Sequence, residues 1–254
     1  MSSKNDWLDF LEHRMIMNNY LAHYGVEGMH WGVRRYQPYS TVPRKSGKSG
    51  KEVGLANSYL RKSYNRNLDK WGKSSNTNVL YITGRSGSGK STVARKIADK
   101  NTRIVHLDTY FDDSNGVRDK ELDSYLNKNL PEYRMLNAPK DQISLNDWGK
   151  ICCKFEVELE KYGSYQYKRG NKVIVEGVEL LDDTIRPDKS FFKDKPIAIL
   201  KTNPITSSTR AMKRDNIKLN RDELSIAFDN HMMWSKDIRK FKNDIDKKKV
   251  NNHG

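Results

Sequence analysis

One eight-residue segment, Gly84–Ser91, restricts the fold of this 254-residue chain more than any other. It reads GRSGSGKS, and it follows a short apolar run, Val79–Thr83. Closely spaced glycines let a backbone turn tightly enough for successive N–H groups to converge on one anion. This spacing of glycines, lysine and serine is the phosphate-loop pattern, which needs a strand before it and a helix after it. The sequence predicts both, with the helix over Ser91–Lys100.

Each fixed position of the loop has a chemical role. Lys90 places a cation beside the β- and γ-phosphates of a bound nucleotide, and the Ser91 hydroxyl can bind Mg²⁺. The helix that begins near Lys90 points its positive end at the same anion. ATP and Mg²⁺ are therefore the expected ligands. The residues expected to bind the nucleotide are Gly84, Arg85, Ser86, Gly87, Ser88, Gly89, Lys90, Ser91 and Thr92.

Short apolar runs alternate with helical patterns from residue 79 onward. We expect strands at Val79–Thr83, Arg103–Leu107, Lys172–Glu176 and Pro196–Leu200. A mostly helical stretch over Lys120–Tyr162 and helices over Thr206–Lys218 and Glu223–Phe241 are predicted between and after them. This alternation is typical of a parallel sheet covered on both faces. The fold class predicted is α/β, a P-loop NTPase three-layer sandwich with a parallel sheet.

The first 78 residues have a different character. Apolar spacing predicts a helix over Trp7–Leu21 and another over Leu55–Trp71, and His23–Arg35 is a turn-rich aromatic block. The stretch between this block and the second helix is rich in Pro, Gly, Ser and Lys, as flexible linkers are. We therefore expect a mostly helical, partly flexible extension before the P-loop domain. The boundaries predicted are 1–36 for the N-terminal motif, 37–54 for the linker, 55–78 for a connecting helix, 79–246 for the P-loop domain and 247–254 for a frayed tail.

Two acidic residues follow predicted strands. In open α/β sheets ligands bind at the carboxyl ends of the strands. Asp108 can accept a proton from a substrate hydroxyl or bind Mg²⁺ while Tyr110 shapes the substrate pocket; the alternative is that Asp108 only caps the next turn. Glu176 can hold Mg²⁺ directly or through water. A single Glu before a glycine, Gly177, weakens the interpretation as an ATP hydrolase.

Arg210 and Arg214 are four residues apart and so share one helix face. Two guanidinium groups there can close over phosphates and stabilise the charge of a transferred group. The alternative is an ordinary solvated basic helix. The catalytic set predicted is Lys90, Asp108, Arg210 and Arg214, with Asp108 and Tyr110 at the substrate and Ser91, Glu176 and Asp108 at the metal.

Composition limits the classes of partner. The net charge of +15 favours a polyanion: nucleotide phosphates, nucleic acid or an acidic surface. No run approaches the roughly 18–20 apolar residues of a membrane span, so no membrane association is expected. The two cysteines, Cys152 and Cys153, are neighbours, which argues against a disulfide framework and favours a reducing compartment.

Together these segments resemble the uridine kinase and phosphoribulokinase-like group of P-loop kinases. The resemblance rests on the loop Gly84–Thr92, on Asp108-Thr109-Tyr110, on the strand Val173–Gly177 and on the Arg-x-x-x-Arg-Asp of Arg210–Asp215, all in the family's order. It implies an ATP-dependent phosphotransferase with an alcohol-group acceptor, Asp108 as the catalytic base and the arginines as a lid. The chain departs from the family at Asn137–Asp141, where the family's nucleoside-binding segment is expected, and at Tyr165–Arg169, to which the family's arginine-bearing stretch is reduced.

The block His23–Arg35 resembles a motif of structural proteins of tailed phages. This resemblance implies a phage-encoded protein in the cytoplasm of the bacterial host or on the virion, with residues 1–36 docking to phage head or other virion proteins. The function predicted is transfer of the γ-phosphoryl group of ATP to a hydroxyl of a nucleoside-like or other small molecule. Two alternatives stay open: a kinase acting on nucleic acid, at a 5′-hydroxyl or a modified base, and a virion or host-interaction protein that only binds nucleotide.

Overall fold

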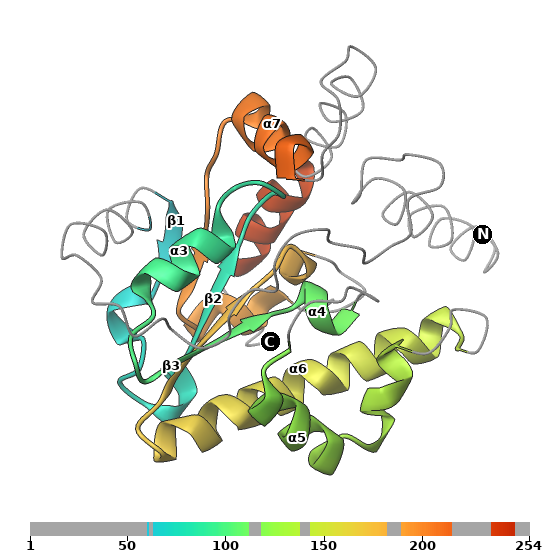
Figure 1. Cartoon of the computed structure of the whole chain (residues 1–254). Coiled ribbons are helices and arrows are strands. Elements are labelled where there is room, and N and C mark those ends of the chain that lie inside the picture. The colour runs from blue at the N-terminus through green and yellow to red at the C-terminus, as the bar shows by residue number, and fades with distance from the viewer. Residues whose placement is uncertain are drawn as a thin grey trace, which may run out of the picture.

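The computed structural model describes residue 60 and residues 63–111, 118–137, 143–181, 189–214 and 235–246. In these residues a five-stranded sheet has the strand order β1-β5-β2-β4-β3, with helices on both of its faces (Figure 1). Neighbouring strands pair in parallel, except that β1 is antiparallel to β5. The predicted α/β class and its mostly parallel sheet are confirmed, and the arrangement is compatible with a P-loop fold.

The strands follow the apolar runs of the sequence closely. Two have the predicted bounds, β2 (Val79–Thr83) and β4 (Lys172–Glu176), while β3 (Thr102–His106) is shifted by one residue and β5 (Ile197–Ile199) is shorter. Because both faces of these strands are covered, their side chains are nearly all buried. Such strands are continuous apolar runs rather than alternating ones.

The helices begin at side-chain caps where the sequence offers them. The carboxylate of Asp119 accepts hydrogen bonds from the backbone at the start of α5, and Ser144 accepts one at the start of α6. The long helical stretch predicted from Lys120 is thus two α-helices separated by a 3₁₀ segment. The helices are α3 (Lys90–Ile97), α4 (Asp108–Phe111), α5 (Lys120–Asn129), α6 (Leu145–Lys168) and α7 (Pro204–Arg214), and residues 235–246 are helical too. The 3₁₀ segments are η1 (Leu68–Lys70), η2 (Ser75–Thr77), η3 (Pro131–Asn137), η4 (Glu179–Leu181) and η5 (Lys189–Asp194).

The sheet separates two apolar cores. On one face, buried side chains of α3 pack on Leu80, Ile82, Ile104 and Ile174. On the other, the alternate strand residues pack against α5, α6 and the helix over 235–246. Cys152 and Cys153 are free thiols on α6. The two cores make the sheet a rigid middle layer, and the carboxyl ends of its parallel strands meet at one edge.

The region before β2 is not the predicted helix. Residues Tyr64–Arg66 form the edge strand β1, paired with β5 from Tyr64↔Ile199 to Arg66↔Ile197. Asn67 then adopts a left-handed conformation with φ 52°, which ends the strand before the 3₁₀ segment η1 begins. Trp71 donates its indole N–H to the carbonyls of Asn78 and Val173. The folded unit therefore includes residues well before the predicted start at 79, and the connecting helix predicted over 55–78 is wrong from Ser63 to Asn78.

Some predictions fall on other parts of the chain. The N-terminal motif, the linker and the tail after 246 lie outside the described residues, as do 215–234 of the predicted C-terminal helices. No helix in the described ranges is both long enough and apolar enough to cross a membrane.

A glycine in the C-terminal third of α6 sets the distance between this helix and the sheet. A Cβ on Gly163 would lie 2.3 Å from Cγ2 of Val79. The Gly163 carbonyl accepts a hydrogen bond of 2.8 Å from the buried Asn78 amide, just before β2. Since Val79 opens the strand that leads to the phosphate loop, this close approach also fixes where the loop lies.

We predict that Gly163→Ala lowers the free energy of unfolding by about 2 kcal/mol, although alanine is the better helix former, because overpacking outweighs the gain in propensity. Val79→Ala removes the opposing methyl group. In a double-mutant cycle by urea unfolding, the combined loss should fall short of the sum by at least about 1 kcal/mol. Simple additivity would show that the two residues do not contact each other.

Candidate nucleotide-binding site

The phosphate loop joins the end of β2 to the start of α3, as predicted. Gly84, Gly87 and Gly89 have φ values of 144°, 72° and 89°, which residues other than glycine rarely adopt. At Gly84 space is also restricted, since a Cβ would lie 2.9 Å from the carbonyl oxygen of Leu200. The glycine positions of the pattern are thus required by the observed backbone.

Lys90 is the first residue of α3 and its side chain turns back over the loop. Its Nζ donates to the carbonyl oxygens of Gly84 at 3.1 Å and Arg85 at 3.2 Å. The ammonium group therefore lies against the loop backbone, next to the amino end of α3. This concentrates positive charge where the sequence predicts nucleotide phosphates.

The outer side of the loop is held by two later segments. Arg85 donates to the carbonyl of Thr202 at 3.3 Å and to the hydroxyl of Ser235 at 2.6 Å. The Thr202 hydroxyl in turn donates to the carbonyl of Ser88 at 3.3 Å. Burial lowers the pKa of the Arg85 guanidinium from its ordinary value. Arg85 is therefore a bridge between the loop, the segment after β5 and the helix over 235–246.

Glu176 is the centre of the site's polar contacts. It ends β4, is only 3% exposed, and its Oε1 accepts a hydrogen bond of 2.7 Å from the Ser91 hydroxyl. The same oxygen contacts Nδ1 of His106, which is 1% exposed. Burial by itself raises the pKa of the Glu176 carboxyl, but the bond from His106, the charges of His106 and Lys90 and the bond from Ser91 outweigh it, so the pKa is lowered. The carboxylate is ionised and accepts from both donors.

The predicted metal residues fit a hard cation only in part. Ser91 and Glu176 are in contact, and Asp108 opens α4 two residues beyond the end of the adjacent strand β3. Within the described ranges no three His, Cys, Asp or Glu side chains converge in a metal-binding group. Mg²⁺ characteristically takes one or two protein ligands and completes its shell with phosphate and water. A serine hydroxyl beside an ionised carboxylate satisfies that requirement.

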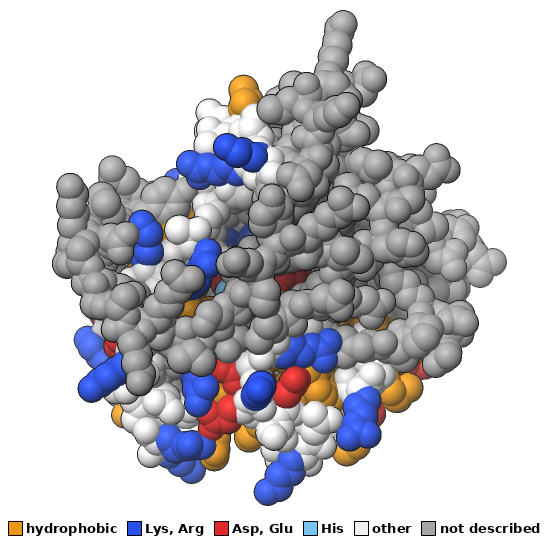
Figure 2. All heavy atoms as spheres, viewed as in Figure 1, with side chains coloured by type: hydrophobic (Ala, Val, Ile, Leu, Met, Phe, Trp, Pro, Cys, Tyr) orange, Lys and Arg blue, Asp and Glu red, His pale blue; other side chains and the backbone are white. Residues whose placement is uncertain are grey.

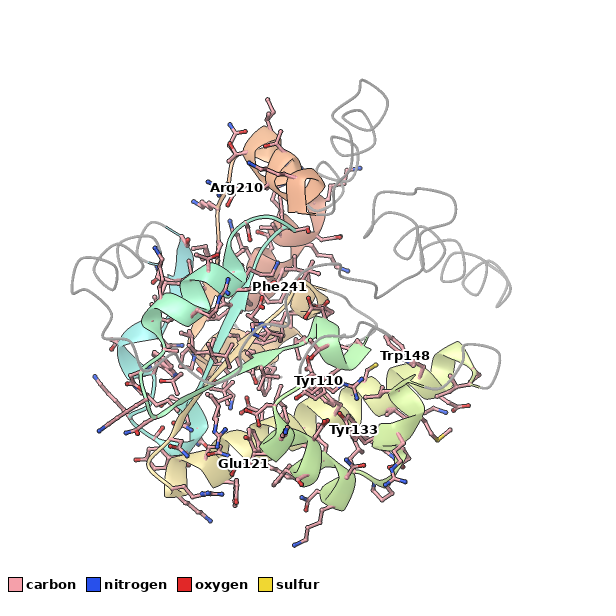
Figure 3. The ribbon with its side chains drawn as sticks, in the orientation of Figure 1. Tyr110, Glu121, Tyr133, Trp148, Arg210 and Phe241 are labelled. Carbon is pink, nitrogen blue, oxygen red and sulfur yellow. The ribbon has the colours of Figure 1, made fainter. Side chains whose placement is uncertain are left out.

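The structure places Tyr110 in the core rather than at a substrate pocket. Its side chain is 0% exposed, and its ring centroid lies 5.5 Å from that of Phe155 and 6.4 Å from that of Tyr133 (Figure 3). Its hydroxyl accepts a hydrogen bond from the backbone N–H of Asp119. Burial raises the pKa of Tyr110 well above its ordinary value. Because the aromatic ring is packed from all sides, the predicted substrate contact is replaced by a structural role.

The two predicted lid arginines lie on α7, beyond β5. Arg210 is exposed and lies at the opposite end of the molecule from Glu121 (Figure 3). Arg214 is the last residue of α7, and the structure describes its backbone but not its side chain. The structure thus brings Lys90, Ser91 and Glu176 together, with Asp108 on the neighbouring strand end, and leaves the arginines on a separate element.

Two residues near the carboxyl end of β3 were not predicted to belong to the site. His106 pairs in register with Glu176 across β3 and β4, so both side chains lie on the α3 face of the sheet. The signal was available, since a histidine that ends one predicted strand and a glutamate that ends the next share the same edge. Arg118 donates to the carbonyl of Thr109 at 2.6 Å and lies over the ring of Tyr110 at 5.4 Å. A lone arginine after a loop carries no such signal.

Part of this chain is similar to two uridine kinases. Over 118 residues it is 28% identical to the uridine kinase of Limosilactobacillus reuteri (strain DSM 20016), covering 41% of this chain and 51% of that protein. Over 117 residues it is 29% identical to that of Clostridium botulinum (strain Okra / Type B1), covering 41% and 54%. The chain thus spans about half the length of the curated relatives it matches. This weak similarity supports a P-loop kinase-like group.

The N-terminal block has a separate match. Residues 15–38 match a family of unknown function, DUF7211, which gives no support to a phage origin. No solved structure matches the chain significantly.

The Glu176 contacts predict a specific pH dependence of stability. A carboxyl whose pKa is lower in the folded than in the unfolded state stabilises the fold above its ordinary value of 4.5, and the stabilisation is lost as the pH falls toward its folded value. The stability difference between the wild type and Glu176→Gln should therefore shrink below pH 4.5, by up to about 1.4 kcal/mol per pH unit.

Urea unfolding of both proteins from pH 6 to pH 3 measures this change. Glu132→Gln is the matched control, since Glu132 forms an exposed ion pair with Lys154, and such pairs contribute little to stability. If the Glu176 and Glu132 variants show the same pH dependence, the carboxyl of Glu176 is not held in its charged form.

We predict that Tyr110→Phe lowers the free energy of unfolding by about 1–2 kcal/mol, because the buried N–H of Asp119 loses its acceptor. Since the hydroxyl points into the core, the affinity for ATP and the Michaelis constants should stay within about twofold of the wild type. Chemical unfolding and steady-state kinetics check the two halves separately. A large rise in the Michaelis constant of the acceptor with unchanged stability would restore the substrate role.

Proposed function

We propose that this protein is an ATP-dependent kinase that transfers the γ-phosphoryl group to a hydroxyl of a nucleoside-like or other small molecule. The observation that carries the proposal is the hydrogen bond of 2.7 Å between Ser91, behind the phosphate loop, and the buried Glu176 at the end of the adjacent strand. It joins an anion-binding loop to a cation-binding carboxylate, which is the combination that phosphoryl transfer requires.

The phosphates would be held by groups that are already in position. The loop glycines turn the backbone, the amino end of α3 faces the same point, and the Nζ of Lys90 lies within 3.2 Å of two loop carbonyls. Catalysis of phosphoryl transfer is mostly positioning and electrostatic stabilisation, so a rigid loop with a fixed cation supplies much of it.

Ser91 and Glu176 would hold the metal. Mg²⁺, when bound, would neutralise the charge of the β- and γ-phosphates. Because the Ser91 hydroxyl donates its proton to Glu176, the lone pairs of its oxygen remain available to a cation. The carboxylate can accept further hydrogen bonds from metal-bound water, which is how a partner of a metal ligand supports the site.

Asp108 is the proposed base for the acceptor hydroxyl. It follows β3 directly, and β3 is the neighbour of β4, so Asp108 and Glu176 lie at the same edge of the sheet. Arg210 and Arg214 lie on α7, after β5. Between β5 and α7, the Thr202 hydroxyl contacts the loop at the carbonyl of Ser88. We propose that these arginines close over the transferred group, where they would stabilise its charge.

The surroundings of Glu176 favour transfer over hydrolysis. At Gly177, the position behind it, a Cβ would lie 2.8 Å from the Cβ of Leu107 and 2.2 Å from Oε2 of Glu179. No side chain that could activate water fits at this position. The acceptor is therefore proposed to be the hydroxyl of a second substrate rather than water.

The resemblance to the kinase family gives little information about the identity of the acceptor. In Tyr165–Arg169, to which the family's arginine-bearing stretch is reduced, Arg169 donates hydrogen bonds to Glu121 at 2.6 Å and to the Tyr165 hydroxyl. The segment ends α6 at the start of β4, which is the opposite edge from Glu176. On the face shown in Figure 2, the described Lys and Arg side chains are spread over the surface, so the +15 charge does not by itself select nucleic acid.

The test is a transfer assay with γ-labelled ATP against nucleosides, nucleotides, other small alcohols and oligonucleotides with free 5′-hydroxyls. Labelled nucleoside or other small-molecule product supports the proposal. Label only on oligonucleotides, falling steeply with salt, would replace it by a nucleic-acid kinase. Nucleotide binding without transfer to any acceptor would contradict the kinase and favour a nucleotide-binding interaction protein.

With the acceptor in hand, we predict that Asp108→Asn retains ATP affinity and lowers turnover by about 10²–10⁴-fold, the contribution of a general base. Lys90→Ala should instead lose nucleotide affinity as well, because it removes the cation at the phosphates. Calorimetry and single-turnover transfer separate the two effects. If Asp108→Asn weakens nucleotide binding and leaves turnover intact, Asp108 is a metal ligand and not the base.

A further inference from the structure

The contact between His106 and Glu176 serves no step of the proposed transfer, yet it is central to the site. Three elements meet at one oxygen atom, Oε1 of Glu176. Ser91 approaches it from α3 at 2.7 Å, His106 approaches it from β3, and the carboxylate itself stands on β4. Since an ionised carboxylate only accepts hydrogen bonds, the Nδ1 of His106 must carry the proton that it shares with this oxygen.

The backbone holds His106 and Glu176 in this relation. Their Cα atoms are register partners in the parallel pair of β3 and β4. One residue on, the N–H of Leu107 donates to the carbonyl of Glu176 at 2.9 Å. The register therefore keeps the two side chains next to each other on one face of the sheet.

His106 also faces the other side of the site. Its carbonyl oxygen accepts a hydrogen bond of 2.8 Å from the hydroxyl of Thr109, the residue next to Asp108. The side chain of His106 thus reaches the proposed metal residues, while its main chain supports the start of α4, which carries the proposed base.

We propose that His106 is a positioning residue that fixes the carboxylate of Glu176, and through it the Ser91 hydroxyl, for the binding of a divalent cation with nucleotide. The final torsion of a glutamate is broad and leaves the carboxylate free to rotate. Two donors on the same oxygen remove that freedom. A carboxylate so held keeps the Ser91 proton turned toward itself, and the lone pairs of the serine oxygen stay turned away from it.

This inference rests on the proposed function, because it concerns the metal that would accompany ATP. Removal of a partner that orients a metal ligand typically costs about 10- to 100-fold in metal affinity. A histidine that only filled space would affect the stability of the fold and leave the metal dependence unchanged. The two roles therefore differ in a measurable quantity other than catalytic activity.

Asparagine and glutamine at position 106 form a matched pair for the test. The amide nitrogen of asparagine and the Nδ1 of histidine are both bonded to Cγ, so His106→Asn keeps a donor at the same branch point. His106→Gln moves the donor one atom further out, and His106→Leu removes it while keeping an apolar volume. The measurement is the affinity for ADP by calorimetry over a series of Mg²⁺ concentrations, which gives the Mg²⁺ midpoint of each protein, together with urea unfolding.

We expect His106→Gln and His106→Leu to raise the Mg²⁺ midpoint by about 10-fold or more, and His106→Asn to stay within about threefold of the wild type. The affinity for ADP without Mg²⁺ should be the same in all of them. Equal midpoints for the Asn and Gln variants would overturn the inference, even if His106→Leu does not fold. If Mg²⁺ does not change the ADP affinity of the wild type, the proposed function itself fails, and the inference fails with it.

Discussion

The site depends on keeping one carboxylate charged inside the protein. Glu176 ends the strand that lies between β2 and β3, and it is almost completely removed from water. Burial of an isolated charge costs several kcal/mol unless hydrogen bonds and nearby opposite charges offset it. Here Ser91, His106 and the charge of Lys90 do so. Lys90 and Ser91 open α3 and His106 ends β3, so the start of α3 and the pairing of β3 with β4 are tied to the same charge.

The phosphate loop is held from its other side by the C-terminal helix that the structure describes. Arg85 reaches Ser235 at the start of residues 235–246. At the end of the same helix, Asp246 accepts bonds from Tyr64 and Arg66 of β1. One helix therefore connects the edge strand, which comes first in the folded unit, with the loop. The segment before β2 belongs structurally to the nucleotide-binding unit, although nothing in its apolar pattern distinguishes it from a separate helix.

Sequence patterns predicted the parts of the fold that local chemistry determines. The loop, the four parallel strands and the position of Glu176 follow from glycine spacing and apolar runs. The strand β1 did not, because its residues are held by distant partners. The helical spacing of Leu68 and Trp71 correctly predicted that they pack on the core, but Leu68 lies in the 3₁₀ segment η1 and Trp71 follows it. Tyr110 was misassigned for a related reason, since a tyrosine beside an acidic residue has the same pattern whether it points to a ligand or into the core.

The direction of the chain at β4 limits how the acceptor can be recognised. A strand of five residues rises about 13 Å between its first and last Cα atoms, so Lys172 and Glu176 lie at opposite edges of the sheet. The helix α6 runs unbroken for 24 residues to Lys168 and joins β4 at the far edge, where Arg169 is bound to Glu121. Side chains of this connection therefore cannot reach Asp108. In the kinase that we propose, recognition of the acceptor has to come from segments that lie at the carboxyl edge, where α4 begins. In the kinase that we propose, acceptor specificity can thus differ from that of the uridine kinases to which part of the chain is similar, while Lys90 and Glu176 keep the roles proposed for them.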